Sequence, residues 1–192
     1  MKGIFDLPEG YSEIKRVDLQ KNKKMMVLIN VFGLLIGLVL FLLGVWIVPL
    51  SFEIGPDNLL LTLAQLFGTL LAMILYVVAH EWVHGIFIKK YSGRKAKYGF
   101  TGPFAYAGSD AFFNKREYVV IALAPVVVFG ALFLLLNLLL PSSWFWSIYF
   151  LQIVNVSGAV GDFYITGLMG TLPADVLTTD KGVTMLIYSK TK

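Results

Sequence analysis

The most informative absence in this sequence is cysteine. None of the 192 residues is a cysteine, so no disulfide can form and no thiolate can serve as a nucleophile or metal ligand. Histidine is scarce, with two in the chain, and charged residues make up 15% against roughly a quarter in soluble domains. Any metal site must therefore be built from histidine, aspartate and glutamate.

What the sequence has in excess is long apolar runs. Hydrophobic residues make up 57% of the chain, and the mean hydropathy is +0.75. They are concentrated in four runs, each long enough for a transmembrane helix, which needs about 20 mostly apolar residues. A soluble protein with buried helices would not need four runs of this length. We therefore expect an all-α polytopic membrane protein with four transmembrane helices, at about residues 25–48, 59–90, 115–140 and 144–170.

The connection between the second and third spans has a different pattern. From Lys95 to Phe100, polar or small residues alternate with apolar ones, and Gly102-Pro103 marks a turn. This alternation predicts a short β-hairpin between the two spans. One hypothesis is that the segment Lys95–Gly108 pairs with an extended substrate through its main chain. The alternative is an amphipathic connector at the membrane interface.

The positions of the basic residues predict the orientation in the membrane. Of the sixteen Lys and Arg residues, six lie in residues 1–24, seven in 89–116 and three in 181–192, whereas the turns at 49–58 and 141–143 contain none. Basic residues are retained on the cytoplasmic side, so both termini and the hairpin should be cytoplasmic. This orientation also accounts for the net charge of +4, and we expect no nucleic-acid partner.

The same pattern divides the chain into three parts. We expect a cytoplasmic N-terminal segment at residues 1–24, a four-span membrane domain at residues 25–170, and a cytoplasmic tail at residues 171–192. The expected partners are the membrane itself and a membrane-protein or peptide substrate. The sequence does not define an oligomeric state.

The strongest chemical signal is the motif His80-Glu81-Trp82-Val83-His84, which contains both histidines of the chain. On a helix, residues four apart face the same way, so the two imidazoles can bind one ion. A bound zinc ion lowers the pKa of its water to about 7, and Glu81 lies where it can accept a proton from that water. Interfacial histidines beside a solvated glutamate would be the structural alternative, but ionisable groups among membrane spans are usually functional.

A catalytic zinc ion needs a third protein ligand and an open position. Asp162 is the best candidate, because it is the acidic residue of the fourth span and lies at a depth similar to that of His80. Gly161 beside it would allow two helices to approach closely. An ion pair with a lysine at the membrane rim is the alternative for Asp162. Asp110 and Glu117 are the alternatives for the third ligand.

Asn155 is a further candidate for the site. It lies seven residues before Asp162, on the same helical face. Its amide could hydrogen-bond a substrate peptide or an oxyanion, or it could join two helices. The residues by themselves leave both alternatives open.

Together these features resemble a known family. The motif at the inner end of a span, Gly161-Asp162 in a later span and the basic loop between them are similar to the “putative zincin peptidase” family of small bacterial membrane proteins, and to the site-2 protease type of intramembrane metalloprotease. The resemblance covers residues 25–170 and implies a bacterial plasma-membrane location. It implies zinc ligands at His80, His84 and Asp162, a catalytic acid/base at Glu81, and a substrate-contacting residue at Asn155.

Three functions are compatible with these features. The first is a zinc-dependent intramembrane or membrane-proximal endopeptidase, in which Glu81 activates a zinc-bound water and passes the proton to the leaving amine. The alternative is a non-catalytic metal-binding accessory or interaction subunit of a membrane complex. A transporter is disfavoured, because the first and third spans offer only Asn30 and Asn137 as polar groups within the bilayer.

Overall fold

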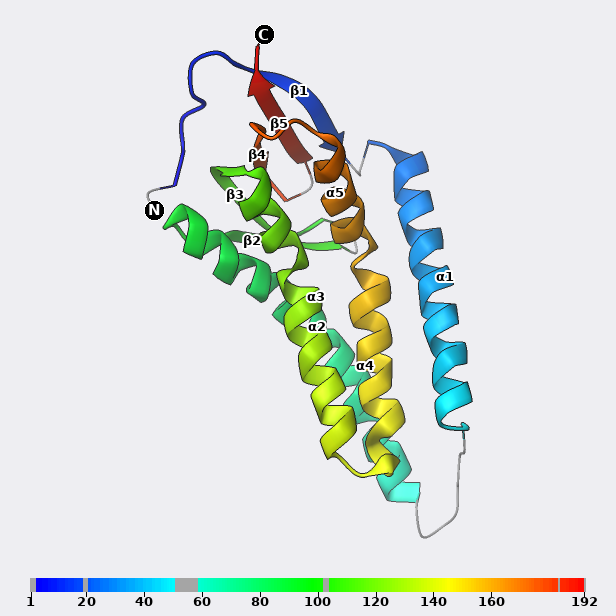
Figure 1. The fold of residues 1–192 in the computed structure, drawn as a ribbon. Coiled ribbons are helices and arrows are strands. Elements are labelled where there is room, and N and C mark those ends of the chain that lie inside the picture. The colour runs from blue at the N-terminus through cyan, green and yellow to red at the C-terminus, as the bar shows by residue number, and fades with distance from the viewer. Residues whose placement is uncertain (1–2, 19–20, 51–58, 102–103, 183, 192) are drawn as a thin grey trace.

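The structure, a computed structural model, describes residues 3–18, 21–50, 59–101, 104–182 and 184–191. The long helices run side by side, and the strands gather at the end of the helices where both termini lie (Figure 1). The C-terminal end of α1 (Lys23–Ile47), the N-terminal end of α2 (Leu59–Ser92) and the connection between α3 (Lys115–Leu139) and α4 (Phe145–Gly158) lie at the opposite end (Figure 1).

Four stretches of helix are long and apolar enough to cross a membrane, as the sequence predicts. The third begins with a capping box, in which Asn114 and Glu117 each accept a hydrogen bond from the other's backbone amide. Residues 51–58 of the turn expected at 49–58, and the turn expected at 102–103, lie outside the described residues. The helices are α1 (Lys23–Ile47), α2 (Leu59–Ser92), α3 (Lys115–Leu139), α4 (Phe145–Gly158) and α5 (Val160–Thr171), with a short 3-10 helix η1 (Ser142–Trp144) before α4.

The predicted fourth span is divided into α4 and α5 rather than continuous. The α-helical conformation is interrupted at Ala159, where ψ is 15°. Gly158 and Gly161 flank this position, and glycine is a weak helix former because its backbone has more freedom to lose. The break places Asp162 in the first turn of a new helix.

The prediction of an all-α protein with one hairpin requires a correction. The hairpin is confirmed, but it belongs to a five-stranded antiparallel sheet in the order β1-β5-β4-β3-β2. The segments expected to be polar tails supply the other three strands. The strands are β1 (Tyr11–Asp18), β2 (Lys97–Thr101), β3 (Phe104–Asn114), β4 (Leu177–Asp180) and β5 (Thr184–Lys190).

The core that joins the sheet to the helices explains why the tails are ordered. In β5, Met185, Ile187 and Ser189 are buried and alternate with more exposed residues, which is the pattern of a strand with one covered face. Ile187 belongs to the same buried cluster as Ile88 of α2 and Met169 of α5. The sheet therefore packs against the ends of the helices that carry the motif and Asp162.

On the other side of the bundle, α1 packs against α4 through small residues. A Cβ atom added at Gly33 would lie 2.9 Å from the Ser157 carbonyl oxygen, and one added at Gly37 would lie 3.6 Å from Ser157 Cβ. Small residues four apart allow two apolar helices to approach closely in a membrane.

Candidate metal centre

The two motif histidines lie on one face of α2, as their spacing predicts. Their rings are 4.8 Å apart between centroids and meet edge to face. The Nε2 atoms of His80 and His84 both face the carboxylate of Asp162. The three side chains thus come together from two helices, although Asp162 is nearly eighty residues from the motif.

The donor atoms of these three residues are spaced suitably for one small metal ion. His80 Nε2 lies 3.4 Å from one Asp162 oxygen, and His84 Nε2 lies 3.7 Å from the other. All three ligand atoms lie within 4.8 Å of one another. A tetrahedral zinc ion with bonds of about 2.0–2.2 Å holds neighbouring ligands roughly 3.4 Å apart, so the arrangement fits zinc. The break before α5 also helps, because the first turn of a helix favours a carboxylate.

His84 is held by a carbonyl group that a proline leaves free. Pro125 lies inside α3 and has no backbone N–H, so the carbonyl of Ile121, four residues earlier, lacks its helical partner. His84 Nδ1 lies 2.9 Å from this carbonyl oxygen. Since a carbonyl can only accept, Nδ1 carries the hydrogen and Nε2 keeps its lone pair toward Asp162. Metal-binding histidines are commonly oriented in this way.

His80 is held by side chains instead. Its Nδ1 atom lies 2.8 Å from the hydroxyl oxygen of Tyr76, which in turn lies 2.8 Å from Asn155 Oδ1. Asn155 Nδ2 donates to the Val126 carbonyl of α3 at 3.1 Å. Asn155 is fully buried, and both ends of its amide are bonded within the protein. Its predicted contact with substrate stays a prediction, and the observed contacts connect it to His80.

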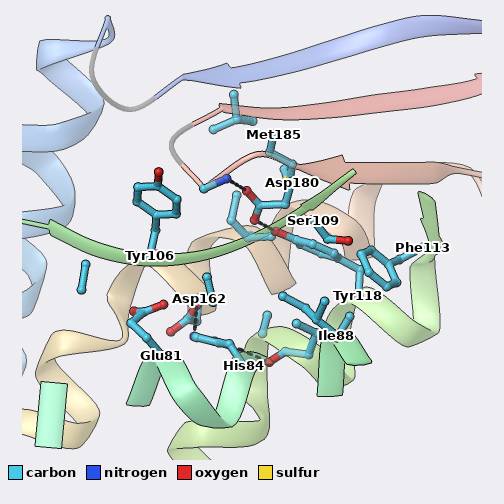
Figure 2. Close-up of a pocket in the computed structure, with 18 residues that line it drawn as sticks. Glu81, His84, Ile88, Tyr106, Ser109, Phe113, Tyr118, Asp162, Asp180 and Met185 are labelled. Atoms are coloured by element: carbon cyan, nitrogen blue, oxygen red, sulfur yellow. Dashed lines mark hydrogen bonds and ion pairs between the residues drawn. The ribbon is translucent and has the colours of Figure 1, made fainter. Parts of the chain in front are cut away.

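Glu81 faces a cavity beside the three candidate ligands. One cavity of about 180 Å³ extends from Glu81, His84 and Asp162 to the sheet, and Figure 2 shows these side chains meeting beside β3. A second cavity of about 280 Å³ extends along α2 and α4 and is lined by His80. Glu81 lines both cavities. The motif glutamate therefore lies where a substrate entering either cavity would meet the candidate ligands.

Strand β3 forms the wall of the site opposite α2. Ala105 and Ala107 line the cavity, and the backbone of Ala107 hydrogen-bonds the Glu81 carboxylate. The Tyr98 side chain of the hairpin lies over Gly85 of α2. A Cβ atom at Gly85 would lie 1.8 Å from the hydroxyl oxygen of Tyr98, so the Tyr98 side chain would have to move away.

The sheet adds an acidic group that the sequence did not indicate. Asp180, at the end of β4, lines the cavity and accepts hydrogen bonds from the Tyr118 hydroxyl and the Gly182 amide. Burial raises the pKa of the Asp180 carboxyl to about 6, although both hydrogen bonds act to lower it. No spacing in the sequence relates Asp180 to the motif, so only the fold could reveal it.

The two alternative candidates for the third metal ligand, Asp110 and Glu117, make other contacts. Asp110 is exposed and pairs with Lys97, and this pair lowers the pKa of the Asp110 carboxyl. Glu117 completes the capping box of α3. Sequence reasoning also missed Tyr76, although it lies four residues before His80 and therefore on the same helical face.

Comparison with known proteins adds a family and a distant relative. Residues 73–177 match the model of a family described as “Putative zincin peptidase”. An uncharacterized 24.7 kDa protein of Pyrococcus woesei is 28% identical over an alignment of 125 residues, which covers 60% of this chain and 52% of the relative. The chain thus matches about half the length of that relative. No solved structure matches this chain.

Proposed function

Because this chain belongs to the “Putative zincin peptidase” family, we propose that it is a zinc-dependent endopeptidase that cleaves membrane proteins or peptides within or beside a membrane. The observation that carries this proposal is the convergence of His80, His84 and Asp162 next to Glu81, at a cavity. The family match covers all four of these residues, and both it and the geometry support zinc peptidase chemistry.

The roles of the residues follow from their positions. His80, His84 and Asp162 would hold zinc, which when bound polarises the scissile carbonyl and a water molecule. Glu81 would accept the proton of the attacking water and deliver it to the leaving amine, because it lines the cavity beside the ligands without being one of them. The hydrogen bond from Ala107 would hold the Glu81 carboxylate in place.

The finer proposal is a peptidase of the site-2 protease type. It is supported by the position of the candidate site on α2 and α5, within stretches of helix that are apolar enough to cross a membrane. The sheet and both termini lie at one end of these helices (Figure 1), and the cavity beside the candidate ligands extends to the sheet. We place that end in the cytoplasm and the helices in the plasma membrane.

Labelling of single cysteines tests this topology. The chain has no native cysteine, so each variant carries one reactive thiol. We expect Gly55→Cys and Ser142→Cys to react with a membrane-impermeant maleimide in intact cells, because all sixteen basic residues lie toward the other side. Lys190→Cys, on the last strand, should react only after permeabilisation. Protection of position 55 or 142 in intact cells would contradict four spans with cytoplasmic termini.

Strand β3 is the element that we propose pairs with substrate. A helical substrate shields its scissile carbonyl with its own hydrogen bonds, so an extended conformation must be stabilised near the ligands. The Ala107 amide points toward Glu81. Alternate amides of a strand share a direction, so that of Ala105 points toward the site as well. No strand pairs with this side of β3 between Ala105 and Gly108 among the described residues.

Proline at position 105 tests the pairing. Ala105→Pro removes one backbone donor with little change in bulk, and we expect slower cleavage with zinc content unchanged. Ala105→Ser, which keeps the donor, should cleave at the wild-type rate. Ala107→Pro should be more severe, because it also removes the contact with Glu81. Wild-type cleavage by Ala105→Pro would show that β3 does not pair with substrate.

The proposed function is tested by comparing membrane-protein fragments in cells that produce the wild type or Glu81→Gln. Fragments should be produced only by the wild type, and their new termini should map within or next to apolar segments. Equal fragment patterns, together with no cleavage by the purified wild type, would favour a non-catalytic metal-binding subunit.

A further inference from the structure

The hydrogen bonds around His80 form a chain that ends on a backbone carbonyl. The chain runs from His80 Nδ1 to the Tyr76 hydroxyl, to the Asn155 side chain, and to the Val126 carbonyl of α3. Each link is between 2.8 and 3.1 Å, which is the normal length of a hydrogen bond. Because its last member has no hydrogen to give, the direction of every earlier bond can be worked out.

The direction follows from simple donor and acceptor rules. The Val126 carbonyl can only accept, so the NH₂ group of Asn155 faces it, and the amide oxygen of Asn155 faces Tyr76. That oxygen can only accept, so the Tyr76 hydroxyl donates its single hydrogen to it. The Tyr76 oxygen is then left as an acceptor for His80, and the hydrogen of the imidazole must be on Nδ1.

We propose that Asn155 and Tyr76 are positioning residues that set the tautomer of His80, keeping the Nε2 lone pair free for the metal. The proposal rests on the zinc site proposed above. It gives Asn155 a role distinct from substrate contact, since its amide acts on the metal centre through two other side chains. His84 is held in the same tautomer by a single hydrogen bond, from its Nδ1 to the Ile121 carbonyl.

The surroundings of the chain hold it in this one arrangement. The Tyr76 ring packs against Phe129 and Phe133, with centroids 5.2 and 5.8 Å away. Gly130 of α3 lies beside the amide, since a Cβ atom there would be 3.4 Å from Asn155 Nδ2, in van der Waals contact. Asn155 is 0% exposed, so water has no access to replace either of its bonds.

Removing the amide should reverse the effect of Tyr76. In Asn155→Leu the Tyr76 hydroxyl has lost the acceptor of its hydrogen. His80 Nδ1 can become the new acceptor, provided that it carries no hydrogen itself. The wrong tautomer, with the hydrogen on Nε2, is then favoured. We expect zinc affinity to fall about 10–100-fold, the usual effect of removing a partner of a metal-binding histidine.

A double variant separates this mechanism from a general loss of packing. Adding Tyr76→Phe to Asn155→Leu removes the misdirected donor, so the double variant should bind zinc more tightly than Asn155→Leu alone. A purely structural role predicts equal or weaker binding. Gln152→Leu is the matched control, because it removes another amide of α4 whose Oε1 has no partner among the described residues. It should bind zinc as the wild type does.

Nitrogen NMR of the zinc-free wild type tests the assignment without any variant. The chain has only two histidines, so ¹⁵N labelling of the imidazoles gives a simple spectrum. At a pH where both rings are neutral, both should carry hydrogen on Nδ1, and in Asn155→Leu one ring should move to Nε2. Hydrogen on Nε2 in the wild type, or no recovery in the double variant, would overturn the proposal even if zinc binds and peptides are cleaved. Failure of the wild type to bind zinc would instead overturn the metal site.

Discussion

Glu81→Gln is expected to lower peptidase turnover by about 10²–10⁴-fold, the usual contribution of a general acid/base group. Glutamine keeps the length and shape of the side chain, and its amide oxygen can still accept a hydrogen bond from Ala107. It cannot accept a proton from water, however, so the attacking group is not activated. Because Glu81 is not one of the three converging ligands, zinc content should stay at the wild-type level. Turnover of a fluorogenic peptide and zinc content would be measured on the same purified sample.

The control for this variant is a glutamate far from the site. Glu13 on β1 is exposed and pairs with Arg16, so Glu13→Gln should cleave at the wild-type rate. If Glu81→Gln cleaves as fast as this control, Glu81 is not the acid/base. If Glu81→Gln loses zinc, the glutamate contributes to the ligand set, and the role of Asp162 must be assigned again.

Asp162→Ala is expected to weaken zinc binding by more than the roughly 10–100-fold typical of residues that only support a ligand. The carboxylate is the sole oxygen donor of the three converging groups and the sole one with a negative charge. Without it, two neutral imidazoles remain, which is fewer than the three protein ligands of a catalytic zinc site. Competition with a chelator would measure the affinity, and turnover should fall in parallel when zinc is limiting.

The alternative ligand provides the control for Asp162. Asp110 lies in the hairpin, is exposed, and pairs with Lys97, so Asp110→Ala should retain wild-type zinc affinity. Wild-type affinity in Asp162→Ala, combined with a loss in Asp110→Ala, would move the third ligand to the hairpin. Loss in both variants would indicate that the hairpin helps to hold the site.

The break between α4 and α5 connects these predictions to the fold. In a continuous helix, Asp162 would lie in mid-helix, whereas in the structure it lies in the first turn of α5, where the helix dipole favours negative charge. The glycines beside it suggested close helix packing in the sequence. In the structure, Gly158 and Gly161 flank the break between α4 and α5 instead.

The sequence by itself determined those features that depend on near neighbours along the chain. The apolar runs predicted the four helical stretches, because a helix satisfies its own backbone groups wherever the run is long enough. The spacing of His80 and His84 placed both imidazoles on one face, since residues four apart always share a face. The capping box of Asn114 and Glu117 is equally local, as it involves a single turn.

Only the tertiary structure decided what lies between distant segments. The terminal strands β1 and β5 pair although Tyr11 and Lys190 stand at opposite ends of the chain, and no local pattern specifies that partner. The Ile121 carbonyl holds His84 directly, and the Val126 carbonyl holds His80 through Asn155 and Tyr76. Every residue has a carbonyl, so the role of these two depends on which helix approaches them. The sequence could therefore supply the ligands. The orientation of the two histidines comes from the packing of α3 and α4 against α2, because each tautomer depends on partners that are neighbours in space alone.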